Sequence, residues 1–322
     1  MKYFKFLFEI DKKPRRGLLV VEWVTMGYLL LTTLLILFCW TKMQNPEPML
    51  WGRFRMVMLT AAMWLVYRLV PCRFTHLCRT AVQMFSLGWW YPDTYQLNLI
   101  FPNFDHLFAG YEQQLFGFQP ALVFAERVSN PVFSELMHLG YGSYYPLIIM
   151  ETLFYFFFRN REFNRTAFII TTSFFIFYAV FIFLPVTGPQ YYYLAAGLDN
   201  IARGVFPDIG NYFATHTESL PIPGYADGQF YQFVASMHKA GECPTAAFPS
   251  SHVGITSILL MLAWRSGSRW LLFTILPLYL LMCLATVYIQ AHYAIDVLGG
   301  WVSAVVIYLG LSLLWKKWIF KL

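Results

Sequence analysis

The chain has 322 residues, of which 58% are hydrophobic, 20% are aromatic and only 12% are charged. Such a small share of charged side chains cannot cover a water-facing surface. The composition therefore excludes an ordinary soluble domain and indicates an integral membrane protein. The net charge is +6, but no basic stripe follows a polar helix, which argues against nucleic acid as a partner. The five cysteines have neither paired nor metal-ligand spacing, and we interpret them as small buried side chains.

Eight apolar stretches are candidates to cross a bilayer as helices, because a hydrocarbon core about 30 Å thick needs roughly 20 helical residues. They span residues 17–40, 54–71, 77–92, 134–158, 166–186, 249–264, 270–290 and 294–315. The third is the weakest, since it is short and contains Gly88 and Pro92. We therefore predict an all-α fold, a multi-pass transmembrane helical bundle with six to eight crossings.

The distribution of Lys and Arg predicts the orientation of this bundle. If all eight stretches cross and the N-terminus is cytoplasmic, 17 of the 23 basic residues lie on the cytoplasmic side. Such an excess is typical of cytoplasmic loops, and seven crossings would break it. We expect both termini to be cytoplasmic, in a plasma or inner membrane. Residues 93–133 and 187–248 are then long outer segments, whose aromatic content favours interfacial helices or a lid.

Three polar islands interrupt the apolar stretches, and all three fall on the outer face in this topology. They are Gly188-Pro189-Gln190-Tyr191-Tyr192-Tyr193, Pro249-Ser250-Ser251-His252 and Ala291-His292-Tyr293-Ala294-Ile295-Asp296. The last two lie at the outer ends of helices that we expect to be neighbours. Because ionisable residues beside membrane helices are functional by default, the islands form a candidate active site.

His292 and Asp296 are four residues apart, a spacing that places both on one face of a helix. The carboxylate would then accept the proton on one imidazole nitrogen and leave the other as a free lone pair. Such an imidazole is a nucleophile, and the carboxylate stabilises the positive charge that it gains on bonding to phosphorus. A polar pair that satisfies itself inside the bundle is the alternative, and this pair alone does not decide between the two.

His252 supplies the second group that phosphoryl transfer needs, a proton donor for the departing oxygen. Ser250 and Ser251, which follow Pro249, indicate a helix start whose hydroxyls and free N–H groups form an anion site. Simple helix capping also explains these serines.

Taken together, the two histidine islands resemble a known family. Pro-Ser-Ser-His, followed 40 residues later by His-Tyr-x-x-Asp-Val-x-Gly-Gly, resembles the second and third signature motifs of the type 2 phosphatidic acid phosphatase superfamily. With Gly-Pro-x-Tyr-Tyr upstream, the tail looks most like the inositol phosphorylceramide synthase and sphingomyelin synthase branch. The resemblance covers roughly residues 134–315. It implies that His292 is the nucleophile, Asp296 its partner and His252 the acid and base.

The sequence departs from the phosphatase pattern at its basic positions. Gln190 stands in the region of the first motif that holds a lysine and an Arg-Pro, and Ala285 and Thr286 take the places of a Ser-Arg pair. Gln290 stands two residues before His292, where related synthases often carry arginine. Those cations neutralise a phosphate monoester with a charge of about −1.5 to −2. Their absence favours a phosphodiester, which carries one negative charge and which amide and hydroxyl donors satisfy.

We therefore predict a lipid phosphotransferase that moves a head group from a phospholipid donor to a lipid alcohol acceptor such as a ceramide, through a phosphohistidine. The expected substrate contacts are Ser250, Ser251, Gln190, Tyr191, Gln290, Lys239, Tyr141, Tyr144 and Asp105. His238 and Arg203 are further candidate cations. One aspartate and two histidines with separate roles leave too few ligands for a metal, and no cofactor is implied.

This prediction divides the chain into three parts. Residues 1–133 form transmembrane anchors and an outer interfacial segment, residues 134–315 the catalytic transmembrane core, and residues 316–322 a basic cytoplasmic tail. Two other functions stay open. A lipid phosphate or polyprenyl pyrophosphate phosphatase would use the same histidines with water as the acceptor, and a non-enzymatic carrier or scaffold would explain the missing basic residues. The head group, the acceptor lipid and the oligomeric state are not indicated.

Overall fold

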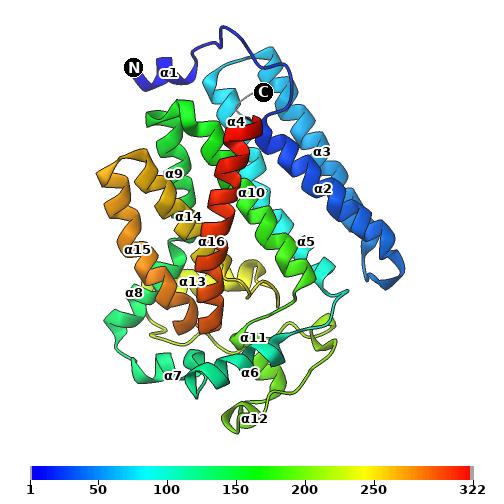
Figure 1. Ribbon diagram of the computed structural model, residues 1–322, viewed down its shortest axis with the longest axis vertical. Helices are drawn as coiled ribbons and strands as arrows, with labels where there is room; N and C mark the ends of the chain where they lie inside the picture. The colour runs from blue at the N-terminus through cyan, green and yellow to red at the C-terminus, as the bar shows by residue number, and fades with distance from the viewer. Residues whose placement is uncertain (1, 320–322) are drawn as a thin grey trace.

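The computed structural model describes residues 2–319, which form a bundle of helices (Figure 1). Within this range no β-strand occurs, apart from an isolated antiparallel bridge between Ile10 and Cys72. The prediction of an all-α fold is confirmed. The helices that correspond to the eight predicted stretches are α2 (Val20–Phe38), α3 (Pro46–Leu69), α4 (Arg73–Phe85) with α5 (Leu87–Asn98), α8 (Pro131–Gly142) with α9 (Tyr144–Phe158), α10 (Asn160–Phe183), α14 (Ser251–Ser266), α15 (Arg269–Tyr288) and α16 (Ala294–Leu314).

Five helices in the described part of the chain are long and apolar enough to cross a membrane. They are α2, α3, α10, α15, and α16 together with its π-helical extension η3 (Trp315–Ile319). The helix α9 is apolar but has 15 residues, and α14 has 16. The molecule therefore has the character of a multi-pass membrane bundle, and the predicted range of six to eight crossings is approximate.

Two of the predicted crossings are broken by a single serine. The hydroxyl of Ser86 donates to the carbonyl of Gln83 at 2.7 Å, between α4 and α5, and that of Ser143 donates to the carbonyl of Gly140 at 2.6 Å, between α8 and α9. Such local bonds compete with the helical ladder and favour a bend. Hydropathy does not detect these breaks, because both flanking segments are apolar.

The helix α10 forms the centre of the bundle. It contacts α2, α5, α9, α14 and α16, and 72% of its apolar window is buried, against 28–39% for the other four spanning candidates. Those outer helices expose large apolar side chains such as Leu34, Trp51, Phe273 and Val306. Such a surface is suited to contact with lipid, since hydrocarbon chains are as apolar as these side chains.

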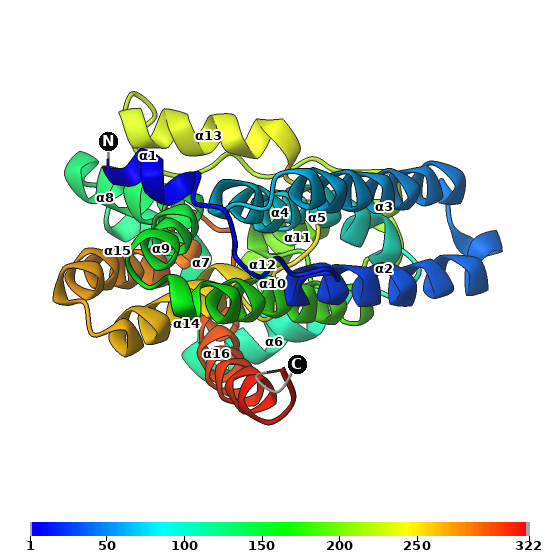
Figure 2. The ribbon, with the colours of Figure 1, turned by 90° about the horizontal axis from the view of Figure 1, so that it is seen from above.

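Short helices of the two long outer segments gather at one end of the bundle (Figure 1). They are α6 (Asp105–Phe116), α7 (Pro120–Arg127), α11 (Pro189–Ala196) and α12 (Leu198–Ala202), and we call them the cap. The helix α13 (Gln229–Gly241) packs along α8 (Figure 2). The remaining short elements of residues 2–319 are α1 (Lys2–Leu7), η1 (Trp40–Lys42) and η2 (Tyr212–Ala214).

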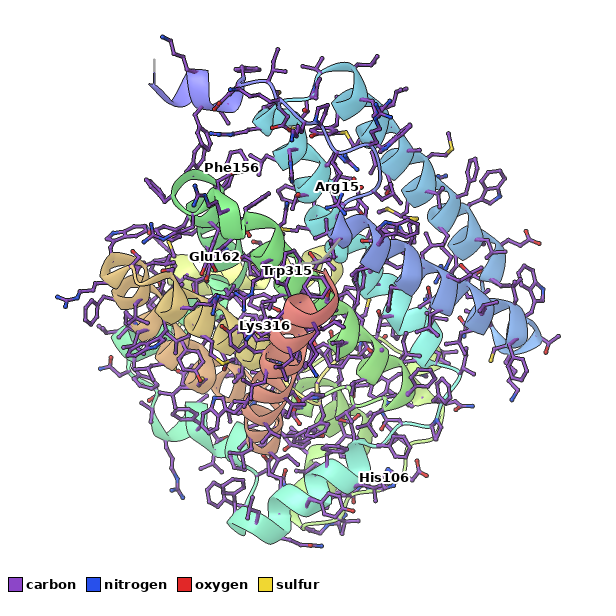
Figure 3. The ribbon with its side chains drawn as sticks, turned by 45° about the horizontal axis from the view of Figure 1, so that its top comes forward. Arg15, His106, Phe156, Glu162, Trp315 and Lys316 are labelled. Atoms are coloured by element: carbon purple, nitrogen blue, oxygen red, sulfur yellow. The ribbon has the colours of Figure 1, made fainter. Side chains whose placement is uncertain are left out.

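The start of the chain and the end of α16 lie away from the cap. His106 on α6 marks the capped end, whereas Arg15 and Lys316 lie toward the other end (Figure 3).

Two buried ion pairs hold the N-terminal helices together. Arg79 pairs with Glu22, joining α4 to α2, and Arg53 donates two hydrogen bonds of 2.8 Å to Asp93, joining α3 to α5. Loss of one partner would leave an uncompensated charge inside the bundle.

Candidate active site

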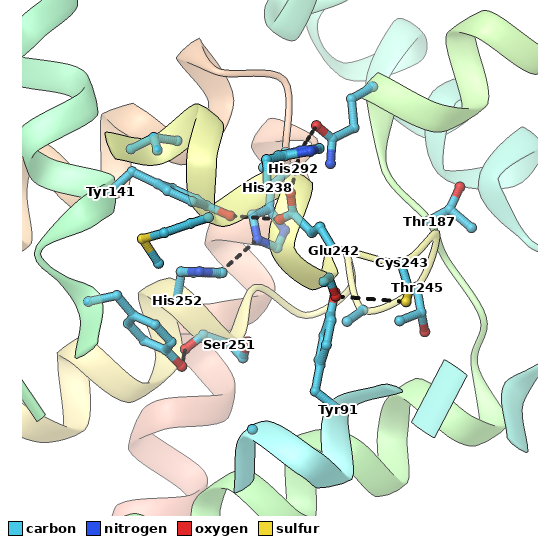
Figure 4. Close-up of a pocket in the computed structure, with 18 of the residues that line it drawn as sticks. Tyr91, Tyr141, Thr187, His238, Glu242, Cys243, Thr245, Ser251, His252 and His292 are labelled. Carbon is cyan, nitrogen blue, oxygen red and sulfur yellow. Dashed lines mark hydrogen bonds and ion pairs between the residues drawn. The ribbon is translucent and has the colours of Figure 1, made fainter. Parts of the chain in front are cut away.

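A cavity of about 330 Å³ at the capped end of the bundle brings the three polar islands together (Figure 4). Its walls come from α5, α8, α9, α10 and α13, and from the loops that precede α11 and α14. His252 in the first turn of α14 and His292 before α16 both line it. His252 and His292, which are 40 residues apart in the sequence, therefore line the same cavity.

His292 has one nitrogen fixed by the protein and one facing His252. Its Nδ1 lies 2.8 Å from the main-chain carbonyl oxygen of Ala247. A carbonyl only accepts hydrogen bonds, so Nδ1 carries the proton and Nε2 holds the lone pair. Nε2 lies 3.4 Å from Nδ1 of His252. The lone pair of the predicted nucleophile thus points toward the predicted proton donor.

The predicted helical face for His292 and Asp296 is wrong, because α16 begins at Ala294 and His292 precedes it. Asp296 lies in the first turn, where its Oδ2 accepts a hydrogen bond of 2.8 Å from the backbone N–H of Tyr293. That carboxylate is still 3.5 Å from Nδ1 of His292. Since the carbonyl of Ala247 is nearer, it orients the ring, and the carboxyl group of Asp296 lies beside it as a second acceptor.

Two tyrosine rings hold His252. The ring centroids of Tyr141 and Tyr144 lie 4.6 Å and 4.3 Å from that of the imidazole. The start of α14 is set by Ser250, whose side chain accepts a hydrogen bond of 3.4 Å from the N–H of Val253. His252 is therefore positioned by a helix cap and by aromatic contacts that restrict its ring.

Two glycines of α16, just after the third island, let this helix approach the start of α14. A Cβ atom on Gly300 would lie 2.8 Å from the carbonyl oxygen of Ser250, and one on Gly299 would lie 2.6 Å from the ring of Phe248. Neither contact is compatible with a side chain at the existing backbone separation. The Gly-Gly pair therefore explains how the two histidine islands come within contact distance.

Burial controls the charge of His292, whose side chain is 3% exposed. Desolvation lowers the pKa of His292 to about 4, although the hydrogen bond to Ala247 and the charge of Glu242 act in the opposite direction. Near neutral pH the imidazole is uncharged. It therefore keeps the lone pair that a nucleophile needs.

Five of the nine predicted substrate contacts line the cavity: Ser251, Gln190, Tyr191, Tyr141 and Tyr144. The side-chain oxygen Oε1 of Gln190 lies 2.8 Å from Nε2 of His238. This leaves the amide nitrogen of Gln190 without a hydrogen-bond partner among residues 2–319. It is available as a donor to a ligand.

Three other predicted contacts lie elsewhere. Ser250 is fully buried and caps α14. Lys239 is exposed on α13 and does not line the cavity. Gln290 has a left-handed backbone (φ +64°), its carbonyl accepts a hydrogen bond of 3.0 Å from the N–H of Gln190, and its side chain lines a separate surface depression. These three side chains were expected to contact the substrate, but they hold structural or solvent-exposed positions outside the cavity.

Asp105 also has a different role from the one expected. Its fully buried carboxylate accepts hydrogen bonds from the backbone N–H groups of Thr187 (2.6 Å) and Gly188 (2.9 Å) and from the hydroxyl of Tyr293 (2.9 Å). It does not line the cavity. Burial raises the pKa of Asp105, and these hydrogen bonds oppose the rise. Asp105 therefore fastens the first island to the third.

Glu112, also on α6, reaches the same turn. Its Oε1 accepts a hydrogen bond from the backbone N–H of Ala294, the first residue of α16. Burial and the nearby charge of Asp296 raise the pKa of Glu112 to about 8. The helix α6 thus supports the turn of residues 292–294 with two carboxyl side chains, Asp105 and Glu112.

Sequence reasoning missed two groups of the site. The carbonyl of Ala247 could not be found, because every residue has one and the contact spans 45 positions. Glu242 lines the cavity, where its Oε1 accepts a hydrogen bond of 3.2 Å from the hydroxyl of Tyr141 and its Oε2 contacts Nε2 of His238. It is one of several acidic residues in a long outer segment, so its type and position gave no distinguishing signal.

Within the described chain, no Lys or Arg lines the cavity. Arg203 hydrogen-bonds to the carbonyl of Asp199 and to the side chain of Asn200 on the exposed surface. His238 lines the cavity, as expected for one of the candidate cations. Residues 2–319 contain no group of three or more His, Cys, Asp or Glu side chains arranged to hold a metal ion.

Comparison with known families gives one match. A family model described as the PAP2 superfamily matches residues 107–310, which is more than half of the chain and includes His252, His292 and Asp296. No curated protein and no solved structure gives a significant match. The match begins inside α6, so it includes Glu112 but not Asp105. The chain belongs to the PAP2 superfamily.

Proposed function

We propose that this protein transfers a phospho-head group from a phosphodiester lipid to a lipid alcohol such as a ceramide, through a phosphohistidine at His292. Membership of the superfamily supports an enzyme of the lipid phosphatase or phosphotransferase type that acts on lipids in the membrane. The transfer reaction, and the likeness to the inositol phosphorylceramide synthase and sphingomyelin synthase branch, are the finer parts of the proposal. One observation carries them: the cavity around the two histidines lacks Lys and Arg in the described chain.

The charge of the cavity favours a diester over a monoester. A phosphate monoester brings a charge of about −1.5 to −2 near neutral pH, and inside a protein cavity that charge needs cationic partners. A diester brings a single negative charge. The amide of Gln190, the hydroxyl of Tyr191 and the side chain of Ser251 are neutral donors suited to that smaller charge.

In the first half of the reaction, Nε2 of His292 attacks the phosphorus of the donor. A nitrogen–phosphorus bond forms and the bond from phosphorus to the diacylglycerol oxygen breaks. In this proposal His252 takes up a proton when the anionic phosphate of the donor binds beside it, and it then gives this proton to that oxygen, so diacylglycerol leaves as a neutral alcohol. His292 is then positively charged. The carbonyl of Ala247 at 2.8 Å and the carboxylate of Asp296 at 3.5 Å stabilise that charge at Nδ1.

In the second half, the hydroxyl of the acceptor lipid attacks the same phosphorus. His252, now neutral, removes the hydroxyl proton as the oxygen–phosphorus bond forms. The nitrogen–phosphorus bond breaks, and His292 returns to its neutral form. His252 holds the proton again, so one cycle consumes one donor and one acceptor and needs no further reactant.

A transfer assay separates this proposal from the phosphatase alternative. Purified protein in detergent is given a phosphodiester lipid labelled in its head group together with ceramide, and, separately, phosphatidic acid. We expect the label to move to ceramide and to require His292, so that His292→Ala abolishes transfer. The control is His216→Ala, since His216 is an exposed histidine outside the cavity. Rapid release of inorganic phosphate from phosphatidic acid without any head-group transfer would contradict the proposal.

A further inference from the structure

We infer that an acidic phospholipid binds at the end of the bundle away from the cap, with an acyl chain in a groove between α14, α15 and α16 and its anionic head group at Arg265. The inference does not depend on the proposed function, because the groove lies at the opposite end of α14 from His252. Two features of the described chain carry it: the apolar groove itself and a cluster of arginines where the groove ends.

The groove has a volume of about 600 Å³ and is open to the outer surface of the bundle. Its apolar lining residues are Leu260, Met261, Trp264, Leu272, Leu276 and Tyr308. The helix α14 packs against both α15 and α16, whereas α15 and α16 make few contacts with each other. Seen from above, α14 lies between these two helices (Figure 2). The separation of α15 and α16 therefore leaves an apolar space along α14, which suits a hydrocarbon chain.

Arginines concentrate at the end of this groove. Residues 159–165 and 265–269 together carry five arginines and one acidic residue, Glu162. The arginines, which we call the basic cluster, are Arg159, Arg161, Arg165, Arg265 and Arg269. The two segments lie against each other, because Arg159 donates hydrogen bonds of 3.3 and 3.2 Å to the carbonyl of Ser266. This end of the bundle is therefore strongly positive.

Glu162 does not neutralise the basic cluster. Its Oε2 lies 3.3 Å from Nε of Arg265 and 3.8 Å from Nη1 of Arg165, so one carboxylate serves two guanidinium groups. The side chain of Arg265 is 51% exposed, and it lines the groove. Among residues 2–319 the two Nη groups of Arg265 have no hydrogen-bond partner. They can donate to a phosphate, which a guanidinium binds through parallel hydrogen bonds.

Two tryptophans place Arg265 at the level of lipid head groups. Trp264 and Trp270 are 74% and 62% exposed, and exposed tryptophans beside spanning helices are typical of the membrane–water interface. A lipid with a chain in the groove thus brings its phosphate to Arg265. Basic clusters next to spanning helices attract acidic lipids. A zwitterionic lipid adds a cation that the same arginines repel, so an acidic phospholipid fits best.

Photo-crosslinking in nanodiscs of phosphatidylcholine tests the inference on the full-length protein. The probes are a phosphatidylglycerol and a phosphatidylcholine that carry the same photoreactive acyl chain, and the labelled peptides are mapped by mass spectrometry. We expect phosphatidylglycerol to label the groove about fivefold more strongly. Arg265→Ala should remove most of this preference. Arg161→Ala is the matched control, because Arg161 is an exposed member of the basic cluster that does not line the groove.

A second variant tests the groove without changing any charge. Leu276→Trp fills the space and keeps Arg265, so it should reduce labelling of the groove by both probes. Unchanged labelling in this variant, or equal labelling by the two probes in the wild type, would overturn the inference. An equal loss of preference in Arg265→Ala and Arg161→Ala would also overturn it, since the arginines would then act only through general surface charge. His292→Ala should label like the wild type, whatever its effect on head-group transfer.

Discussion

The hydroxyl of Tyr293 donates a hydrogen bond of 2.9 Å to Oδ1 of Asp105, which links the residue after His292 to the first residue of α6. The same carboxylate accepts from the backbone of Thr187 and Gly188. One buried side chain therefore holds the segment of Gln190 and the turn of His292 in a fixed relation. Positions 188 residues apart become neighbours through this contact.

Replacing Asp105 with Asn tests this link. An amide has one acceptor oxygen instead of two, so at least one buried N–H group loses its partner, which costs about 1–3 kcal/mol. We expect a lower thermal midpoint and a drop in kcat of about tenfold or more, with a smaller change in the KM for the donor lipid, because Asp105 does not line the cavity. The control is Asp199→Asn on the exposed surface. Wild-type kcat in Asp105→Asn would contradict the positioning role.

Gly188 is predicted to tolerate no side chain. Its φ of +95° is unfavourable for other residues, and a Cβ atom would lie 2.6 Å from the carbonyl oxygen of Ala291, next to His292. Gly188→Ala should displace that turn, lower the thermal midpoint and reduce transfer by about tenfold or more. Gly110→Ala is the matched control, since nothing lies within 4 Å of a Cβ atom there. Equal activity of the two variants would show that the contact is easily relieved.

The low pKa of His292 makes stability depend on pH. Burial lowers this pKa to about 4, against an ordinary value of 6.5, so the unfolded chain binds a proton in this interval that the folded chain does not. Stability is therefore lost as the pH falls from about 6.5 to about 4. We expect the thermal midpoint of the wild type to fall more steeply over this range than that of His292→Gln. Parallel curves for the two proteins would mean that burial does not keep His292 neutral.

Glu112 should make stability depend on pH in the opposite direction. Its pKa is raised from an ordinary value of 4.5 to about 8 by burial and by the charge of Asp296, so the folded chain holds a proton that the unfolded chain releases. Stability is lost as the pH rises from about 4.5 to about 8. Glu112→Gln keeps an oxygen to accept from Ala294 but cannot ionise, and its thermal midpoint should exceed that of the wild type by a margin that grows with pH. A margin independent of pH would contradict this account.

Much of the fold could be predicted from the sequence because lipid imposes a simple rule on it. Spanning helices need long apolar runs with internally satisfied backbones, and stretches such as 166–186 and 294–315 correspond closely to α10 and α16. The two histidines were found because their short motifs are rare combinations of polar residues beside apolar runs. Five of the predicted substrate contacts, including Gln190 and Tyr144, line the cavity.

The other features of the site depend on tertiary packing, which the amino-acid sequence does not reveal directly. The carbonyl of Ala247 displaces Asp296 as the nearest partner of His292 only because the loop before α14 folds against that turn. Asp105 was expected to line the head-group pocket because it lies in a segment predicted on the same face as the polar islands, and its burial against Thr187 is a tertiary effect. Glu242 was overlooked because its place in the cavity is likewise a tertiary effect.

Trapping the covalent intermediate tests the central claim most directly. Wild-type protein is mixed with a head-group-labelled phosphodiester lipid in the absence of an acceptor, quenched in alkali to preserve phosphohistidine, digested and mapped by mass spectrometry. The account predicts one phospho-head-group adduct, on His292, that disappears on addition of ceramide and is absent from His292→Ala. Transfer to ceramide in the wild type with no adduct on His292, or with an adduct on another residue, would contradict it.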